Sequence, residues 1–264
     1  MNLNNLKIGC DPELFISEGP RVVSFHNKLN GLVKTPVRFS NGEILEDGCS
    51  LEFNLPPATN EVEFSRSIQT MLDSIKEKWQ ITSLSSYLFE EKDIDSPLCW
   101  ESGCNPSINA LTGRRLPATK YCDGLRAAGG HIHIGFDNPT RALRQRVGIM
   151  CDYLLGIPSL FLDSQGSTRR SMYGQAGDIR FKPYGVEYRV LSNFWIFRQE
   201  HRVWAYRQAV NATRAGLDED LFNKITSEVS PEEVQSTING NNVPHAFDIE
   251  ERLRRVLQEG ASWV

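Results

Sequence analysis

The chain has 264 residues, of which 40% are hydrophobic and 23% charged, and its 29 basic and 33 acidic residues give a formal net charge of −4. This composition is typical of one large globular domain and excludes extensive disorder. Because there is no basic excess to neutralise phosphate backbones, we do not expect nucleic-acid binding. No apolar run approaches the roughly 18 residues of a membrane span, and no signal-peptide pattern is present, so we expect a cytoplasmic protein that does not enter a membrane.

The six cysteines do not suggest a structural framework. They lie at positions 10, 49, 99, 104, 122 and 151, which is too few and too irregular for a disulfide scaffold. Cys99 and Cys104 form the only close pair, and no second pair completes a tetrahedral site. We therefore expect reduced thiols and no zinc.

Strands dominate the first part of the chain. The predicted order is a strand at residues 6–17, its hairpin partner at 21–26, a loop-rich stretch at 28–48 and a strand at 50–55. Pro56 and Pro57 end the last of these because two prolines cannot continue a hydrogen-bonded ladder. A helix capped by Thr59 or Asn60 is expected next, since apolar residues follow at helical spacing as far as residue 75.

Helices dominate the rest. After an irregular segment at 93–128, the predicted order is a strand at 131–136, helices at 140–155 and 156–163, a glycine- and arginine-rich loop at 164–184, a strand at 186–191, and helices at 198–215, 217–228 and 246–258. The two irregular segments are either lids over a ligand site or tolerant surface loops. Because strands and helices do not alternate in βαβ units, we expect a single α+β domain with an antiparallel sheet, helical from about residue 198 onward.

Four of the predicted strands are apolar on one face and carry charged or metal-ligating side chains on the other. The pairs on the polar faces are Asp11 with Glu13, Glu52 with Asn54, His131 with His133, and Glu187 with Arg189. Each pair alone also fits a solvent-exposed strand or, for the histidines, a satisfied core pair. Gathered in one sheet, the carboxylates would repel one another unless a cation lay among them, and this ligand set suits Mg²⁺ or Mn²⁺. Magnesium held in this way keeps positions for substrate phosphates, which points to nucleotide chemistry.

Four motifs resemble those of the glutamine synthetase and glutamate–cysteine ligase superfamily. They are Gly9-Cys10-Asp11-Pro12-Glu13-Leu14-Phe15, Asp47-Gly48-Cys49-Ser50-Leu51-Glu52-Phe53-Asn54, Gly129-Gly130-His131-Ile132-His133-Ile134-Gly135 and Gly185-Val186-Glu187-Tyr188-Arg189. Their order and the chain length are similar to those of the phage-associated carboxylate–amine ligases of type 2, a branch of the amidoligases. The resemblance extends over residues 6–197.

The resemblance implies an antiparallel sheet in the form of an open half-barrel, with ATP and two or three divalent metal ions, Mg²⁺ or Mn²⁺, inside it. It also implies that ATP phosphorylates a carboxylate and that an amine captures the acyl phosphate. The implied metal ligands are Glu13, Glu52 and Asp47 for one ion, with Glu46 as an alternative to Asp47, and Asp11, His131 and Glu187 for the other. The implied nucleotide-phosphate ligands are His133, Arg169 and Arg170, and the implied contacts to the substrate carboxylate or transferring phosphoryl group are Arg189 and Arg180.

Two other functions stay open at this point. His131, His133 and one carboxylate could form the facial triad of a metal-dependent oxygenase or hydrolase, although the polar face holds more acids than a triad needs. The pocket could also belong to a non-catalytic nucleotide-binding module. The sequence leaves the carboxylate and amine substrates open among amino acids, peptides, a protein side chain and a modified nucleotide. It also leaves open whether the chain forms homo-oligomers and whether it is phage-encoded, which would place it in the host cytoplasm.

Overall fold

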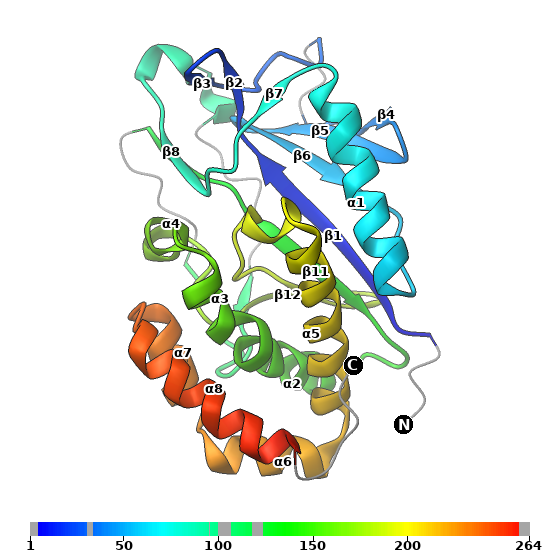
Figure 1. Ribbon diagram of the computed structural model, residues 1–264, viewed down its shortest axis with the longest axis vertical. Helices are drawn as coiled ribbons and strands as arrows, with labels where there is room; N and C mark the ends of the chain where they lie inside the picture. Colours follow the sequence, from blue (N-terminus) through cyan, green and yellow to red (C-terminus); the bar gives the residue numbers. More distant parts are fainter. Residues whose placement is uncertain (1–4, 31–33, 95, 100–106, 118–123, 259–264) are drawn as a thin grey trace.

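The computed structural model describes residues 5–30, 34–94, 96–99, 107–117 and 124–258. Its main sheet consists of β1 (Lys7–Leu14), β4 (Val37–Phe39), β5 (Gly42–Asp47), β6 (Ser50–Asn54), β9 (Ile108–Asn109), β11 (Gly130–Gly135), β12 (Asp178–Lys182) and β13 (Gly185–Tyr188). The strands are antiparallel throughout, in the order β4-β5-β6-β1-β11-β13-β12-β9 (Figure 1). Within the described residues this sheet stays open, with β4 and β9 at its edges. The expected α+β fold with an open antiparallel sheet is confirmed.

Two smaller sheets flank one end of β1. They are formed by β2 (Ile16–Glu18), β3 (Arg21–Val23) and β7 (Gln80–Ile81), and by β8 (Ser86–Leu88) with β10 (Leu125–Ala127). The predicted strand at 6–17 is therefore divided at Phe15. At the break, Phe15 is fully buried in a separate small cluster with Phe89 and Ile94, whereas Leu14 and Ile16 on either side of it lie in the main core.

Three segments that were expected to be irregular contain regular structure. Residues 28–48 include the hairpin of β4 and β5, and residues 93–128 include the short strands β9 and β10. Residues 164–184 include α4 (Gly166–Met172) and β12. The interpretation of 164–184 as a mobile or ligand-facing loop is wrong as to the loop, because its second half is a strand in the main sheet. A helix that was not predicted, α7 (Pro231–Asn239), begins where the Ser230 side chain accepts a hydrogen bond from the amide of Glu233. Cys104 and Cys122 lie outside the described residues.

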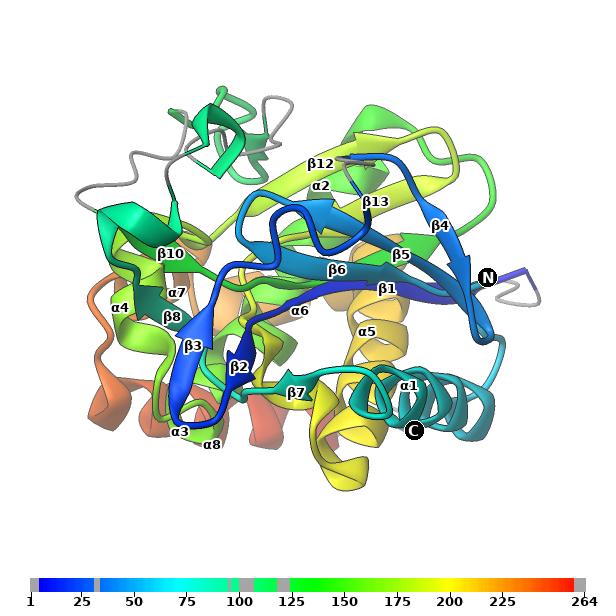
Figure 2. The same cartoon turned by 90° about the horizontal axis from the view of Figure 1, so that it is seen from above.

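The helices lie in two groups. Helices α2 (Arg141–Cys151) and α5 (Gln199–Leu217) contact strands of the main sheet, and α1 (Glu61–Lys76) packs against α5. Helices α3 (Ile157–Leu162), α6 (Glu219–Glu228) and α8 (Val243–Gln258) pack on other helices, and a π-helical turn at Asp152–Gly156 joins α2 to α3. The predicted cap of α1 is confirmed, because the Asn60 side chain accepts from the amide of Glu63 at 2.9 Å. Figure 2 shows α1 and α5 side by side beneath the sheet.

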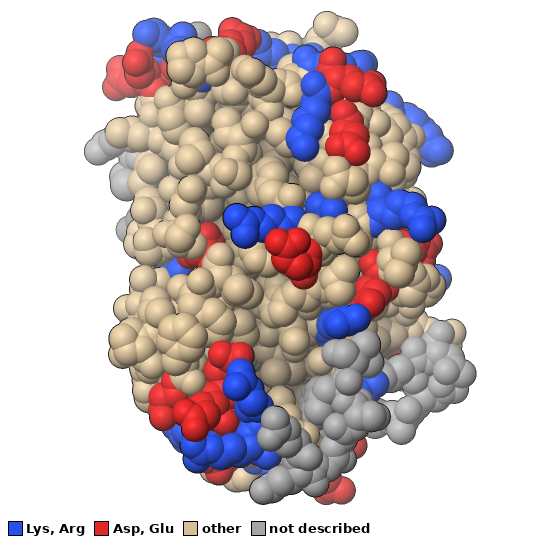
Figure 3. All heavy atoms as spheres, in the orientation of Figure 1, with Lys and Arg blue, Asp and Glu red and all other residues tan. Residues whose placement is uncertain are grey.

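The division of the sheet into two faces follows from the strand alternation. The side chains of Ile8, Ile132 and Val186 are fully buried in the main core. The side chains of Asp11 and His133 point to the opposite face of the sheet, together with the other polar residues at alternate strand positions. On the molecular face in Figure 3, positively and negatively charged side chains are interspersed. None of the described helices is both long and apolar enough to cross a membrane.

Candidate functional site

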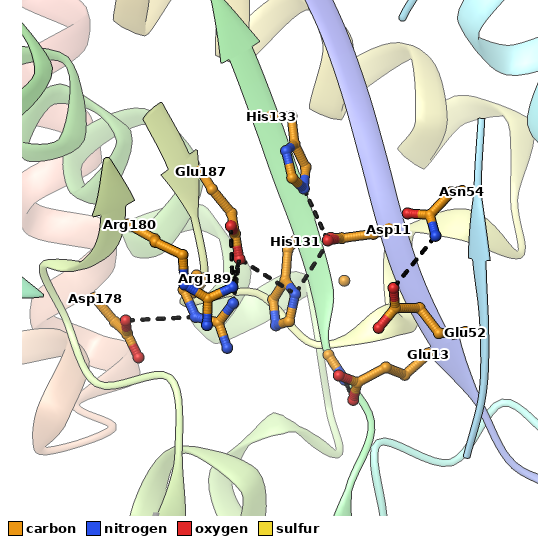
Figure 4. Close-up of polar contacts among 12 residues, drawn as sticks. Asp11, Glu13, Glu52, Asn54, His131, His133, Asp178, Arg180, Glu187 and Arg189 are labelled. Atoms are coloured by element: carbon orange, nitrogen blue, oxygen red, sulfur yellow. Dashed lines mark hydrogen bonds and ion pairs between the residues drawn. The ribbon is translucent and has the colours of Figure 1, made fainter. Parts of the chain in front are cut away.

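The strand register sets the polar side chains of the sheet in adjacent rows. Asp11 of β1 lies opposite His131 of β11, and Glu13 of β1 lies opposite Glu52 of β6. His133 lies opposite Glu187 of β13, which in turn lies opposite Arg180 of β12. Figure 4 shows these side chains converging from neighbouring strands, with Asp11 between the histidines and the two glutamates. Residues more than 170 positions apart in the sequence therefore share one site.

One side of this face holds an acidic cluster formed by Glu13, Asp47 and Glu52. One carboxylate oxygen from each lies within 4.8 Å of the others. Burial, reinforced by the charge of Asp47, raises the pKa of Glu13 to about 7. Burial and the neighbouring carboxylates also raise the pKa of Glu52 well above its usual value. A divalent cation would remove this repulsion, and the all-oxygen donor set suits Mg²⁺ or Mn²⁺, so these three residues fit a metal ion.

Glu46 is excluded from this cluster by the alternation of β5. Its fully buried carboxylate points to the opposite face, where it accepts hydrogen bonds from the amides of Asn27 at 2.9 Å and Leu29 at 2.5 Å. Glu46 therefore anchors residues 27–29, and of the two adjacent acids it is Asp47 that faces the cluster.

A second group centres on Asp11. Its Oδ2 lies 2.9 Å from His133 Nε2, and its Oδ1 lies 3.3 Å from His131 Nδ1. Burial alone would raise the pKa of Asp11, but the two histidines outweigh it and hold that pKa well below its usual range. Asp11 Oδ1 and His133 Nε2 are both buried without a hydrogen bond of normal geometry, so a cation could bind between them.

The second group differs in detail from the expected ligand set. Asp11, His133 and Glu187 have potential ligand atoms within 4.8 Å of one another, whereas the expected set contained His131 and assigned His133 to the nucleotide. His131 is nevertheless close, because its Nδ1 also lies 3.9 Å from Glu187 Oε1. Both histidines therefore lie close to the carboxylates of Asp11 and Glu187.

His131 is a neutral imidazole with Asp11 on one side and Tyr173 on the other. Burial, with the nearby charge of Arg189, lowers the pKa of His131 to about 3, so the ring is neutral at pH 7. A neutral imidazole has one donor and one acceptor nitrogen. Nδ1 faces Asp11 and carries the hydrogen, so Nε2 accepts from the Tyr173 hydroxyl, 3.2 Å away. Tyr173 could not be found by sequence reasoning, because a single tyrosine in a glycine-rich stretch belongs to no motif or periodic pattern.

The other side of the face holds a basic cluster around Glu187. This fully buried carboxylate contacts Arg189, Arg180 Nη1 at 3.2 Å and Lys182 Nζ at 2.8 Å. Asp178 Oδ1 lies 3.8 Å from Arg189 Nε. Three cationic side chains thus surround two carboxylates, an arrangement that suits an anionic substrate group. Sequence reasoning missed Asp178 and Lys182 because it did not recognise β12, although polar residues alternate there with Ile179 and Phe181.

Arg169 and Arg170 do not fit the expected phosphate-binding role. Arg169 is fully buried and donates to the main-chain oxygens of Val190 at 2.6 Å and Arg189 at 2.9 Å. Arg170 is also buried and donates to the Asn241 side chain at 2.7 Å, in the connection between α7 and α8. Their terminal nitrogens hold the strand after β13 and the helical region, although Nε of each arginine is buried without a hydrogen-bond partner among the described residues. These contacts support the site from behind.

A cavity of about 630 Å³ opens beside His133. Its lining includes Lys7, Asn54 and Tyr184, and the Tyr184 hydroxyl lies 2.5 Å from His133 Nδ1. His133 is therefore held between Asp11 on the metal-ligand side and Tyr184 on the cavity side. This volume is within the range of small-molecule sites.

Comparison with known proteins agrees with the motif resemblance over part of the chain, where a family model matches it. The model of the family described as "Phage phiEco32-like COOH.NH2 ligase-type 2", a family of carboxylate–amine ligases, matches residues 105–225, which include His131, His133 and Glu187. The chain is also similar to a solved structure described as "Crystal structure of novel glutamine synthase homolog", with 12% sequence identity and a TM-score of 0.39, over 95% of this chain and 70% of that chain. A search of the curated proteins gives no match.

Proposed function

We propose that this protein is an ATP-dependent carboxylate–amine ligase that works through an acyl phosphate. The observation that supports it most directly is the convergence of five carboxylates and two histidines on one sheet face, next to a basic cluster. The match to a family of carboxylate–amine ligases supports the same reaction class. A facial-triad oxygenase or hydrolase would need only one of these carboxylates.

The acidic cluster and the group around Asp11 are the candidate holders of Mg²⁺ or Mn²⁺. Ions held there would neutralise the β- and γ-phosphate oxygens of ATP. His133, fixed by Asp11 and Tyr184, would face the nucleotide at the mouth of the cavity, which has room for a nucleoside. The neutral His131 is held in one tautomer by Asp11 and Tyr173.

The basic cluster is the candidate site for the carboxylate substrate. In the proposed reaction a carboxylate oxygen attacks the γ-phosphorus and ADP leaves. The amine then attacks the acyl carbon, phosphate leaves, and the nitrogen loses a proton. Arg180 and Arg189 would bind the carboxylate or the transferring phosphoryl group, and their ion pairs with Glu187 hold both guanidinium groups in place beforehand.

The test is capture of the activated carboxylate by hydroxylamine. The protein is incubated with ATP, Mg²⁺, a set of amino acids, peptides and other carboxylic acids, and hydroxylamine, which turns an acyl phosphate into a hydroxamate. We expect ADP and a new hydroxamate mass for a subset of the acids, and neither product in the presence of a chelator. Nucleotide binding with no ADP from any acid would favour a binding module, and iron-dependent turnover would favour the facial-triad enzyme.

Isosteric variants separate the site from the fold in this assay. Glu52→Gln and Glu187→Gln should each abolish hydroxamate formation. Glu43→Gln is the matched control, because Glu43 lies on β5 opposite Asn54 but is exposed. Retained activity in both site variants would contradict the proposal.

A further inference from the structure

Two buried thiols meet at the turn that follows Asp47. Cys49 lies in the β5–β6 turn, and Cys99 ends the short 3₁₀ turn η2 (Pro97–Cys99). Each is only 2% exposed. Cys49 Sγ lies 3.9 Å from the main-chain oxygen of Cys99, and Cys99 Sγ lies 4.0 Å from the main-chain oxygen of Gly48.

The main chains that carry the two thiols also approach closely. A β-carbon placed on Gly48 would lie 3.9 Å from the Cα of Cys99. Hydrogen bonds fix both segments, since Arg126 Nε donates to the Cys99 oxygen at 2.7 Å and the Phe25 amide donates to the Cys49 oxygen at 2.9 Å. A disulfide needs Cα atoms about 4.4–6.8 Å apart, which requires the two main-chain segments to lie close together, as they do where Gly48 approaches Cys99.

The surroundings of Cys99 favour its thiolate. The hydrogen bond from the Cys49 thiol outweighs the effect of burial and, with contributions from Ser24, His26 and Arg126, lowers the pKa of Cys99 to about 6. Burial instead raises the pKa values of Cys10 and Cys151 well above the usual range. Since the thiolate is the reactive form, Cys99 is distinguished from these two buried cysteines.

We propose that Cys49 and Cys99 are a redox modification site that a peroxide converts into a disulfide. The Cys99 thiolate attacks one peroxide oxygen, the O–O bond breaks, and hydroxide leaves while Cys99 becomes a sulfenic acid. The Cys49 sulfur then displaces that oxygen, which forms the S–S bond and releases water. The two thiols lose two electrons in total, and the peroxide is reduced to two water molecules. Because Cys49 is already in contact, the disulfide forms ahead of further oxidation of Cys99.

The bridge would tie the turn after Asp47 to the segment Glu91–Cys99, which holds two short 3₁₀ turns. By the loop-closure relation, a crosslink between residues so far apart in the sequence should raise the Tm on the order of 10 °C. The thiol chemistry does not depend on ligase activity, so the test needs neither ATP nor a substrate.

The test is peptide mapping of the native full-length protein. Fully reduced protein is treated with a slight molar excess of hydrogen peroxide, the remaining thiols are alkylated with iodoacetamide, and the digest is analysed by mass spectrometry. We expect a peptide pair linked through Cys49 and Cys99 that disappears on reduction with a phosphine. The mapping also distinguishes links to Cys104 or Cys122, and either of these in place of the proposed pair would overturn the proposal.

Variants and stability give independent readouts. Cys151→Ser should leave the linked pair unchanged, whereas Cys49→Ser should abolish it and leave Cys99 in a sulfenic or higher oxidation state. If Cys49→Ser fails to fold, the wild-type protein still decides, because its Tm should rise on oxidation and return on reduction. Full alkylation of both cysteines after peroxide treatment, or a lower Tm of the oxidised protein, would refute the site.

Discussion

Glu52→Gln should stabilise the ion-free protein while removing its response to divalent metal ions. The substitution keeps the side-chain volume and the Oε1 atom that lies 3.5 Å from Asn54 Nδ2, but it removes one charge from the acidic cluster. At the 4.8 Å limit that encloses the cluster oxygens, and with an effective dielectric constant of about 20, two unit charges repel by about 3.5 kcal/mol. The unfolding free energy of ion-free Glu52→Gln should therefore exceed that of the wild type by about 3.5 kcal/mol when all three carboxylates are ionised.

The pH dependence follows from the direction of the pKa shift. Burial and neighbouring acids raise the pKa of Glu52, so the wild type relieves the repulsion at low pH by binding a proton. A raised carboxyl pKa contributes stability that is present at low pH and lost as the pH rises through the folded-state value. The advantage of the variant should be small in acid and largest at the alkaline end of the range.

Urea unfolding with a chelator and with excess Mg²⁺ or Mn²⁺ measures both effects. Wild-type protein should gain stability from the metal, whereas Glu52→Gln should gain little. The variant should therefore be the more stable protein in chelator, and its advantage should shrink or reverse in excess metal. Glu43→Gln should behave as the wild type in both, because Glu43 is exposed. A Glu52→Gln protein that is less stable than the wild type in chelator at alkaline pH, or an equal metal response in both proteins, would refute the reasoning.

Three further changes test the supports of the site. Burial raises the pKa of Asp152 to about 7, so wild-type stability should fall by up to about 4 kcal/mol as the pH rises through about 7, and Asp152→Asn should flatten that slope in urea titrations. Tyr173→Phe removes the hydroxyl that donates to His131, so ADP formation should fall several-fold while the unfolding free energy falls by about 1 kcal/mol. Gly130→Ala would place a β-carbon 2.3 Å from the main-chain oxygen of Ser192 and should cost about 2 kcal/mol in urea unfolding, whereas at Gly135 the nearest atom would be 3.7 Å away and the cost should be small.

The sequence was sufficient to predict which side chains share a face of one strand. Alternation put Asp11 with Glu13 and His131 with His133 on common faces, and the structure agrees. It could not say which strands are neighbours, because the pairing of Glu13 with Glu52 depends on register between separate segments. Motif resemblance supplied that information where local patterning did not.

The errors at residues 164–184 share a physical cause, which is that glycine and arginine content was interpreted as a sign of a ligand-facing loop. Gly174 and Gly177 do adopt positive φ angles, of 74° and 78°, but only in the connection that precedes β12. The alternation of apolar and polar residues around Ile179 was the sequence pattern that indicated a strand, and Ile179 is fully buried within β12. Arginine content is equally ambiguous, since Arg169 binds main-chain oxygens in the interior while Arg180 reaches the site face.

The arrangement of charge along the sheet also bears on how substrates would be ordered. Acidic side chains gather over β1, β5 and β6, basic ones over β12 and β13, and the histidines of β11 lie between them (Figure 4). Metal ions would be drawn to the first side and a substrate carboxylate to the second, so a bridging triphosphate would lie along the row of histidines. The order of metal ions, triphosphate and carboxylate along the sheet would then depend on the order of the strands. Shifting charge from one side of the histidines to the other should therefore impair binding even when the total charge is conserved. A Glu52→Gln, Lys182→Gln double variant keeps the net charge and should still lose both metal response and carboxylate activation.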